Sequence, residues 1–548
     1  MLSYRKLAMR VLGRPLHTGG SDSPRPASQR AAALILTAAM LTTLTAPAFA
    51  KEWYIEEGDI TVRAGETEGT NKVSQGENPE VEDTNTVITN SDKDKASSNT
   101  VTIEAKDKDD KVEVTLKDVN IDTSSRSEAA VSVTGEGNTN IELDGDNALK
   151  SDIYSSGISS SGSLTISGGE NDSLTAQGGS GADGIYSSGS LTISGGTVTA
   201  NGGSGGGGDG GDGIWSSGGV TISGGSTVTA NGGDGKDDYG GDGIRSDSGD
   251  VTISGGSTVT ANGGNGGNVS GDGIRSDSGD VTISGGTVKA AGGDSKDGYG
   301  GDGIRSGGVT ISGGTVNAAG GNGGKVGGYG ICSFARVAIS GGTVNAAGGN
   351  GKNSNGGSDG IISNDIDLSG SLELTAKAGR PNGKAISWAG HELDLDTIKD
   401  KLGPGAKVTT TDADGKVNQV SVPRPVEPEE PVIPGESSSS SDGGSAAPSA
   451  PASPLPGLTV TDKDGQRISY TSTQSGNSLT VCVGRLTASF RISLAALRQL
   501  RAEGIDTITF QTILCSTTLS VDELLAMGGE DAEAVLTHRL TASSLTVG

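Results

Sequence analysis

Short runs of alternating apolar and polar residues, separated by glycine-rich breaks, recur at a nearly fixed interval between residues 157 and 360. A Gly-Ile pair marks each repeat, and successive isoleucines are 27, 29, 30, 30, 30, 27 and 30 residues apart. These isoleucines are Ile158, Ile185, Ile214, Ile244, Ile274, Ile304, Ile331 and Ile361. A fixed period of this size is the signature of a repeat architecture built from one supersecondary unit.

Each repeat holds three segments with period 2, which predicts three half-buried strands per unit. In one unit these segments are 243–246, 251–254 and 258–261, separated by breaks such as Gly255-Gly256. One strand triplet cannot bury its own apolar face, so the units must stack, with equivalent residues about 4.8 Å apart. We therefore predict an all-β fold, a right-handed parallel β-helix with three short strands per coil. A propeller blade needs four strands in about 40 residues and fits less well.

The pattern divides the chain into four parts. We predict a signal peptide at residues 1–50, the parallel β-helix at 51–422, a disordered Pro/Ser-rich linker at 423–457, and a small α+β domain at 458–548. The β-helix begins irregularly, with a first pair of strands expected at 53–55 and 59–62 and further strands at 100–104, 112–116, 130–133 and 140–143. Leu393, Leu395 and Ile398 are expected to cover its last coil. In the last domain, Ser493 is the expected cap of a helix that stops at Gly504.

The first fifty residues have the pattern of an export signal. Six arginines and lysines precede an apolar run from Ala31 to Leu44, and Ala48-Phe49-Ala50 is a small-x-small cleavage site. We therefore expect a secreted, extracellular protein, free in the medium or associated with the cell surface. After cleavage no segment is apolar and long enough to predict a membrane span.

Composition and charge narrow the partners. The chain has 548 residues, 95 of them Gly, and a net charge of −26. So acidic a surface repels phosphate backbones, which argues against nucleic acid and favours cations or polymers bridged by cations. Cys482 and Cys515 either pair after export or are two small buried thiols.

One outward-facing row is the sharpest functional signal. If each repeat isoleucine points inward, the next residue points outward. That rule predicts a row of Ser159, Tyr186, Trp215, Arg245, Arg275, Arg305, Cys332 and Ile362. Aromatic rings stack on sugars, and guanidinium forks bind carboxylates such as those of uronic acids. We predict carbohydrate binding by Tyr186, Trp215, Arg245, Arg275 and Arg305. In the alternative interpretation, each arginine pairs with the aspartate three positions earlier, a weak surface interaction.

A second row is acidic. Asp183, Asp212, Asp242, Asp272, Asp302 and Asp359 precede the Gly-Ile pair of their repeats. Neighbouring unit charges at about 4.8 Å repel by roughly 1 kcal/mol even in water, so something must compensate them. The side chains could accept backbone N–H groups at the corner. Alternatively, Ca²⁺ could bind between coils, with Asp212, Asp242, Asp272, Asp302 and the loop residue Asp237 as candidate ligands.

Several strings resemble a known family. Trp53-Tyr54-Ile55, the stretch 141–149 (IELDGDNAL) and the recurring Gly-Ile…Leu-Thr-Ile-Ser-Gly-Gly are similar to the bacterial secreted carbohydrate-binding β-helix domain family, over roughly 51–422. The resemblance implies a pectate-lyase-like fold, binding of cellulose or pectin, bound Ca²⁺ and no catalysis. It assigns no catalytic residue here.

Three functions compete. The first is a non-enzymatic polysaccharide-binding protein or adhesin for plant cell-wall polymers such as pectin or cellulose. The second is a Ca²⁺-dependent lyase or hydrolase, for which Arg275 beside Asp272, Asp277 and Asp280 would have to take a proton. Nearly the same set recurs around Arg245, whereas active sites usually break a repeat. The third is an adhesin or spacer that binds protein partners.

Overall fold

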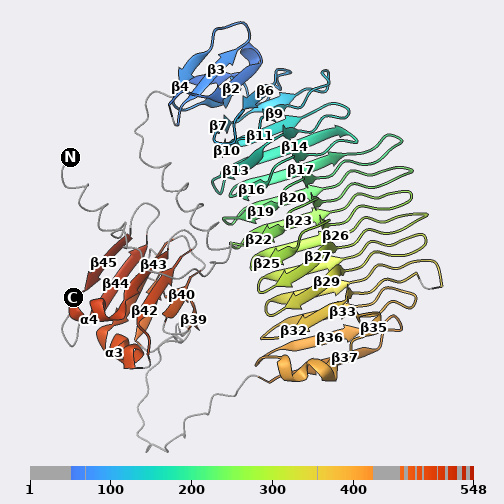
Figure 1. Cartoon of the computed structure of the whole chain (residues 1–548), viewed down its shortest axis with the longest axis vertical. Coiled ribbons are helices and arrows are strands. Elements are labelled where there is room, and N and C mark those ends of the chain that lie inside the picture. Colours follow the sequence, from blue (N-terminus) through green and yellow to red (C-terminus); the bar gives the residue numbers. More distant parts are fainter. Residues whose placement is uncertain are drawn as a thin grey trace, which may run out of the picture. The chain divides into compact units, whose positions relative to one another are not determined.

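The computed structural model describes residues 51–67, 69–354, 356–423, 457–461, 467–468, 470–475, 478–483, 487–502, 504–512, 516–527, 533–538 and 543–547. The predicted signal peptide and almost the whole predicted linker therefore lie outside the described residues. Figure 1 shows the part from residue 52 to 422 as a tall stack of coils, and most coils contribute one strand to each of three faces. The predicted parallel β-helix is confirmed.

The first face stacks the strands that carry the Gly-Ile pair. They are β2 (Ile60–Ala64), β6 (Val101–Glu104), β9 (Val131–Thr134), β12 (Ile158–Ser160), β15 (Ile185–Ser187), β18 (Ile214–Ser216), β21 (Ile244–Ser246), β24 (Ile274–Ser276), β27 (Ile304–Ile311), β29 (Ile331–Ile339), β31 (Ile361–Ser363) and β34 (Ile386–Trp388). All neighbours pair in parallel. Each repeat isoleucine is fully buried against the isoleucines above and below it.

The second face belongs to the same 25-stranded sheet, because β27 and β29 run through both faces. Its other strands are β1 (Glu52–Tyr54), β5 (Val87–Thr89), β7 (Lys111–Lys117), β10 (Asn138–Asp144), β13 (Ser163–Gly168), β16 (Leu191–Ser194), β19 (Val220–Ser223), β22 (Val251–Ile253), β25 (Val281–Ile283) and β32 (Asp365–Leu368). Leucine, valine and isoleucine alternate inward with threonine and serine outward, so this face adds a second aliphatic row to the core.

The third face is a separate 12-stranded sheet. Its strands are β8 (Asn120–Asp122), β11 (Asp146–Lys150), β14 (Ser173–Ser180), β17 (Thr197–Gly203), β20 (Thr227–Asn231), β23 (Thr258–Asn262), β26 (Thr287–Ala291), β28 (Thr315–Ala319), β30 (Thr343–Ala347), β33 (Glu373–Lys377), β36 (Lys407–Thr411) and β37 (Val417–Ser421). Only β37 joins antiparallel, which ends the stack.

Both ends of the stack are covered. At the start, β3 (Asn71–Gln75) and β4 (Val81–Asp83) form antiparallel pairs beside β2, and η1 (Ile55–Glu57) follows β1. The segments 53–55 and 59–62 do not pair with each other, because β1 pairs with β5 and β2 with β6. At the other end lie β35 (His391–Glu392) and the 3-10 helix η2 (Leu395–Lys401). Buried Leu393 and Ile398 join the core there, as expected.

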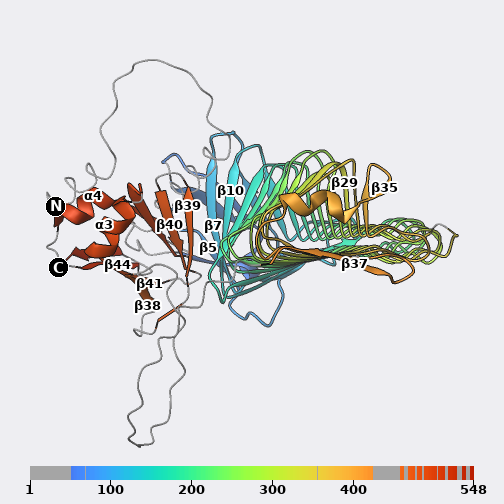
Figure 2. The same ribbon diagram turned by 90° about the horizontal axis from the view of Figure 1, so that it is seen from below.

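The glycine-rich segment between the third face of one coil and the first face of the next forms an arm. Two short arms (151–156 and 178–183) come before long arms that begin with 202–212 and 232–242. Figure 2 shows the long arms stacked to one side of the solenoid as a thin double layer. Their backbones bond in a zigzag: Gly233 N–H donates to Gly211 (2.8 Å), and Gly241 N–H donates to Gly233 (2.9 Å).

Side chains have no room inside this double layer. A Cβ on Gly241 would overlap the carbonyl oxygen of Gly211, and a Cβ on Gly211 would overlap that of Ala182. Glycine is therefore required at these positions by close backbone approach, one of the uses for which only glycine is suited. By contrast, a Cβ on Gly207, at the tip of its arm, would meet nothing within 4 Å.

The C-terminal residues have a hydrophobic cluster of their own. One sheet contains β38 (Leu458–Thr461), β41 (Ala488–Ser493), β44 (Glu533–His538) and β45 (Ser543–Val547), and the other contains β39 (Thr471–Ser475), β40 (Ser478–Cys482), β42 (Thr507–Gln511) and β43 (Ser516–Ser520). The helices are α3 (Leu494–Ala502) and α4 (Val521–Met527).

The predicted helix signals of this domain are present. The hydroxyl of Ser493 accepts the backbone N–H of Ala496 (3.2 Å) at the start of α3, and Gly504 follows its end with φ +90°. Cys482 is a free thiol that donates to Gln511 Oε1 (3.4 Å), whereas Cys515 lies outside the described residues. Across the described residues, no helix is long and apolar enough to cross a membrane.

Candidate functional site: an aromatic and arginine row beside a buried aspartate row

Five side chains lie in one line on the first face of the solenoid. In the register of the neighbouring parallel strands, Tyr186 lies beside Trp215, Trp215 beside Arg245, Arg245 beside Arg275, and Arg275 beside Arg305. Each follows a buried isoleucine and therefore points outward, as the sequence predicts. We call these five residues the outward row. A ligand chain lying along the row would meet one side chain about every 4.8 Å.

The aromatic end of the row is held by its neighbours. Tyr186 and Trp215 pack edge to face with ring centroids 5.2 Å apart. The guanidinium carbon of Arg245 lies 5.0 Å from the centroid of the Trp215 ring. Trp215 Nε1–H also donates to Asp247 Oδ2 (3.0 Å). The indole is therefore fixed in orientation, and these contacts occupy part of the stacking surface that sequence analysis assigned to sugar.

The arginines pair with aspartates, mostly not with those expected. Arg245 Nε–H donates to Asp247 Oδ1 (3.0 Å), and its Nη2 reaches Asp277 Oδ2 (3.3 Å). Arg275 Nε–H donates to Asp277 Oδ1 (2.7 Å). The aspartate three positions before Arg275, Asp272, lies at 3.9 Å. The closest carboxylates therefore follow the arginines by two positions on the first face.

Arg305 is the exception in the row. Two positions after Arg245 and Arg275 stands an aspartate, but two positions after Arg305 stands Gly307. Arg305 therefore lacks the carboxylate partner that the other two arginines have at this position. Arg305 Nη1 lies 3.9 Å from Asp302 Oδ2, and its guanidinium carbon lies 5.3 Å from the centroid of the Phe334 ring. Its side chain is 39% exposed, against 30% for Arg245 and Arg275. Arg305 is thus the arginine of the row best placed to take a carboxylate from outside.

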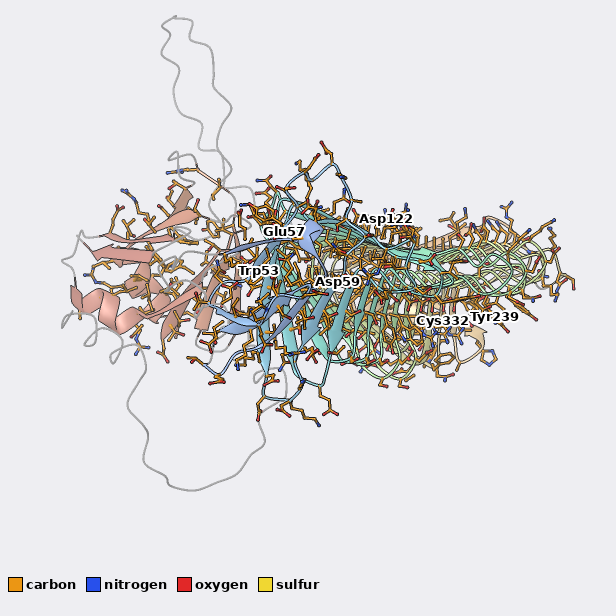
Figure 3. The ribbon with its side chains drawn as sticks, turned by 90° about the horizontal axis from the view of Figure 1, so that it is seen from above. Trp53, Glu57, Asp59, Asp122, Tyr239 and Cys332 are labelled. Atoms are coloured by element: carbon orange, nitrogen blue, oxygen red, sulfur yellow. The ribbon has the colours of Figure 1, made fainter. Side chains whose placement is uncertain are left out.

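The row loses its polar character beyond Arg305. Cys332 and Ile362 continue the register, but Cys332 is buried, and burial raises the pKa of its thiol to about 12. At the other end, Ser159 precedes Tyr186. Figure 3 labels Cys332 on the stack and Tyr239 on a long arm. The stretch able to bind polar ligands therefore extends from Tyr186 to Arg305.

A buried aspartate row runs beside the outward row. Each Oδ1 accepts the backbone N–H of the residue at the same place on the next coil, at 2.5–2.7 Å. The backbone N–H of the first residue donates to the carboxylate of the second in each of these pairs: Asp212 to Asp183, Asp242 to Asp212, Asp272 to Asp242, Asp302 to Asp272, and Tyr329 to Asp302. The bonds to backbone N–H groups agree with one of the two interpretations, although the donor comes from the next coil and not from a local turn.

Burial changes the ionisation of this row. It raises the pKa of Asp242 and Asp272 to about 7, and the charge of the next aspartate in the row adds to the rise. Burial likewise raises the pKa of Asp183 and Asp302 to about 6 and that of Asp212 well above its ordinary value. Desolvation of a carboxylate favours its neutral form, which removes much of the repulsion that the sequence predicts.

A second ladder of this type lies in the long arms. Asp234 Oδ1 accepts Asn265 N–H (2.8 Å), Asn265 Oδ1 accepts Asp294 N–H (2.9 Å), and Asp294 Oδ1 accepts Asn322 N–H (2.6 Å). The sequence pattern had not led us to predict this ladder, although an Asp or Asn follows Gly-Gly in successive repeats. Many loop aspartates and asparagines therefore hold neighbouring arms together.

These contacts bear on the candidate calcium ligands. In the buried aspartate row, one oxygen of each carboxylate already accepts a backbone N–H, at Asp212, Asp242, Asp272 and Asp302. An arginine of the outward row also lies beside this row, as Arg275 does beside Asp242. Asp237 lies apart from them, on the exposed part of a long arm. Within the described ranges, no group of three or more His, Cys, Asp or Glu is arranged to hold a metal ion. Each aspartate of the buried row keeps one further carboxylate oxygen, whereas Ca²⁺ takes six to eight oxygens, so Ca²⁺ binding by the row stays a prediction.

The same geometry bears on the lyase hypothesis. Burial would lower the pKa of Arg275, but Asp242, the hydrogen bond to Asp277 and the charge of Asp272 together raise it above its ordinary value. A guanidinium held in its protonated form cannot accept a proton from a sugar. Arg275 is therefore unsuited to the role of general base that this hypothesis requires.

Among known proteins, the chain is similar to a family of β-helix repeats. A family model described as "Beta helix repeat" matches residues 220–244, 281–304 and 309–331. These segments lie in the regular coils that carry Arg245 to Arg305. No curated protein and no solved structure matches the chain. The chain is thus a β-helix repeat protein, and its function has to be argued from its own residues.

Proposed function

We propose that this β-helix protein is a secreted or cell-surface polysaccharide-binding protein without catalytic activity, and that the polymer lies along the outward row. The observation that carries the proposal is the register of Tyr186, Trp215, Arg245, Arg275 and Arg305 on five successive coils. A repeated, linear ligand matches a repeated, linear set of side chains. The sugar polymers named by the family resemblance, cellulose and pectin, are linear.

The charges around the row make different parts of it suited to different polymers. Because the carboxylates of Asp247 and Asp277 already hold Arg245 and Arg275, those two guanidinium groups have little capacity for an external carboxylate. Tyr186 and Trp215 present apolar rings with polar groups close by, which suits neutral sugars. A uronate would bind best next to Arg305.

Affinity electrophoresis of the full chain tests the proposal. Native gels would contain hydroxyethylcellulose, xylan or polygalacturonate. We expect at least one polymer to retard the protein, and Trp215→Ala to weaken that retardation about tenfold, a loss of about 1.4 kcal/mol. Trp388→Ala is the matched control, because Trp388 is an exposed indole outside the row.

Two results would contradict the proposal. The first is the absence of retardation on every polymer. The second is an equal loss of retardation in Trp215→Ala and Trp388→Ala, which would mean that no particular row is used. Either result would favour the spacer or protein-binding interpretation.

A further inference from the structure

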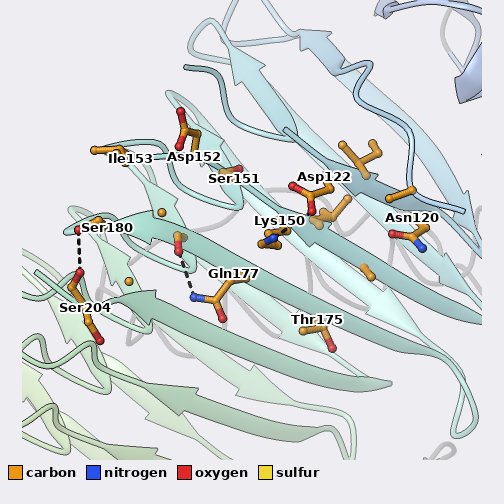
Figure 4. Close-up of a pocket in the computed structure, with 17 residues that line it drawn as sticks. Asn120, Asp122, Lys150, Ser151, Asp152, Ile153, Thr175, Gln177, Ser180 and Ser204 are labelled. Atoms are coloured by element: carbon orange, nitrogen blue, oxygen red, sulfur yellow. Dashed lines mark hydrogen bonds and ion pairs between the residues drawn. The ribbon is translucent and has the colours of Figure 1, made fainter. Parts of the chain in front are cut away.

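A concave pocket of about 680 Å³ lies on the outer face of the 12-stranded sheet, near the start of the stack. It forms where arm length changes. The coils of β11 and β14 carry the short arms 151–156 and 178–183, and the next coil carries the first long arm, which includes Gly203 and Ser204. Figure 4 shows strands as the floor of the pocket and the arms beside it. The volume is typical of a ligand pocket.

Hydrogen-bonding side chains line the floor. Asn120 and Asp122 come from β8, Lys150 from β11, and Thr175 and Gln177 from β14. Lys150 Nζ–H donates to Asp122 Oδ2 (2.9 Å), which fixes the charged pair. Gln177 Nε2 donates to Gly178 O (3.0 Å), yet within the described part of the chain no hydrogen bond engages Gln177 Oε1 or the hydroxyl of Thr175. These two groups are available to a ligand.

An exposed apolar residue lines the edge of the pocket, and an exposed tyrosine follows it in the chain. Ile153, which lines the pocket, is 52% exposed, and the neighbouring Tyr154 is 85% exposed. Tyr154 has φ +63°, a region that aromatic residues rarely occupy, and its N–H donates to Ser180 O (3.2 Å) on the next arm. An exposed ring held in a strained backbone conformation indicates a functional position.

The net charge of the pocket-lining side chains favours an uncharged ligand. Asp122 and Asp152 contribute −2 and Lys150 contributes +1, which gives −1. That balance repels acidic polymers and offers no phosphate-binding cluster. The pocket combines amide, hydroxyl and carboxylate groups with the methyl group of Ala148 and the apolar side chain of Ile153. Such a mixture matches the hydroxyls and apolar faces of sugar rings.

We propose that this pocket is a binding site for a neutral oligosaccharide, separate from the outward row. Gln177 and Thr175 would bond to sugar hydroxyls, and Tyr154 would cover one sugar face from the rim. The pocket lies on the 12-stranded sheet and the outward row on the 25-stranded sheet, so the two sites share no residue. The proposal therefore goes beyond the proposed function and can hold or fail without it.

Isothermal titration of the full chain tests this site, with cellohexaose, xylohexaose and trigalacturonate as probes. We expect one neutral hexasaccharide to bind and trigalacturonate not to bind at the pocket. Ala148→Phe fills the floor without removing a polar group, and it should abolish that binding. Tyr154→Ala should weaken it about tenfold. Tyr239→Ala removes an exposed tyrosine from a long arm and is the control.

Thermal denaturation would show that each variant is folded, which is expected because Tyr154 and Ala148 are exposed. Two outcomes would overturn the proposal. One is that neither neutral hexasaccharide binds. The other is that binding survives in Ala148→Phe but is lost in Trp215→Ala, which would assign the sugar to the outward row.

Discussion

Asp242 accepts the backbone N–H of Asp272 on its Oδ1 at 2.6 Å, and this bond joins two successive coils through a side chain. Both carboxyl groups are buried, and burial raises the pKa of each to about 7. An ionised carboxylate is the stronger acceptor for the backbone N–H, but burial favours the neutral carboxylic acid at the same position. This conflict gives the protein a definite dependence of stability on pH.

We expect the melting temperature to fall as the pH rises from 5 to 8. An acid whose pKa is raised on folding binds its proton more tightly in the folded state. The resulting stability is fully present below the ordinary value of 3.8 and is lost as pH rises through about 6 to 7. Scanning calorimetry at several pH values measures it, and a flat or rising curve would contradict it.

Asp242→Asn should weaken this dependence. The asparagine keeps an Oδ1 acceptor for Asp272 N–H and carries no charge at any pH. We expect its melting temperature at pH 8 to exceed that of the unmodified protein by about 2–5 °C. Asp237→Asn, on an exposed arm, is the control and should follow the unmodified protein.

Arg305→Gln should reduce retardation by polygalacturonate more than Arg245→Gln does. Arg245 is held by Asp247 and Asp277, whereas the ion pair between Arg305 and Asp302 is longer, at 3.9 Å. We expect a loss of about tenfold for Arg305→Gln. The measurement is affinity electrophoresis at low salt. Equal losses in both variants would show that the aspartates do not restrict the row.

Gly241→Ala should destabilise the solenoid by about 1–3 kcal/mol, because its methyl group would overlap the carbonyl of Gly211. Gly207→Ala is the matched control at the open tip of an arm and should be close to neutral. Urea denaturation monitored by circular dichroism compares them. If both variants were equally stable, the arms would not be closely packed.

Chelation by EDTA should leave the melting temperature at pH 7 unchanged. The Oδ1 atoms of the aspartate row already join successive coils by accepting backbone N–H groups, so we expect the coils to hold together without a Ca²⁺ ion. A fall in melting temperature that added Ca²⁺ reverses would place a cation elsewhere in the acidic arms. Repeating the titration in Asp237→Asn would then test that residue.

Much of this architecture could be read from the chain. Each repeat isoleucine precedes an outward residue, so the register of Trp215, Arg245 and Arg275 follows from spacing alone. The partners of those side chains could not be read in the same way. Asp277 reaches Arg245 from the next coil, and sequence distance gives no measure of that approach.

The roles of the acidic and glycine-rich segments also needed the fold. Asp234 and Asn265 look like separate loop residues, yet stacking makes one the acceptor for the other. The pocket beside Tyr154 was not predicted, because it arises from a change in arm length between adjacent coils.

The sequence by itself determined the solenoid, its three faces and the outward row, because a period-2 pattern repeated every 27–30 residues permits only stacked, in-register strands to bury the isoleucines. Only the tertiary structure decided which aspartate holds which arginine, which carboxyl groups are buried and where the surface is hollow. Those properties depend on contacts between coils and on the exclusion of water, which local patterns do not encode.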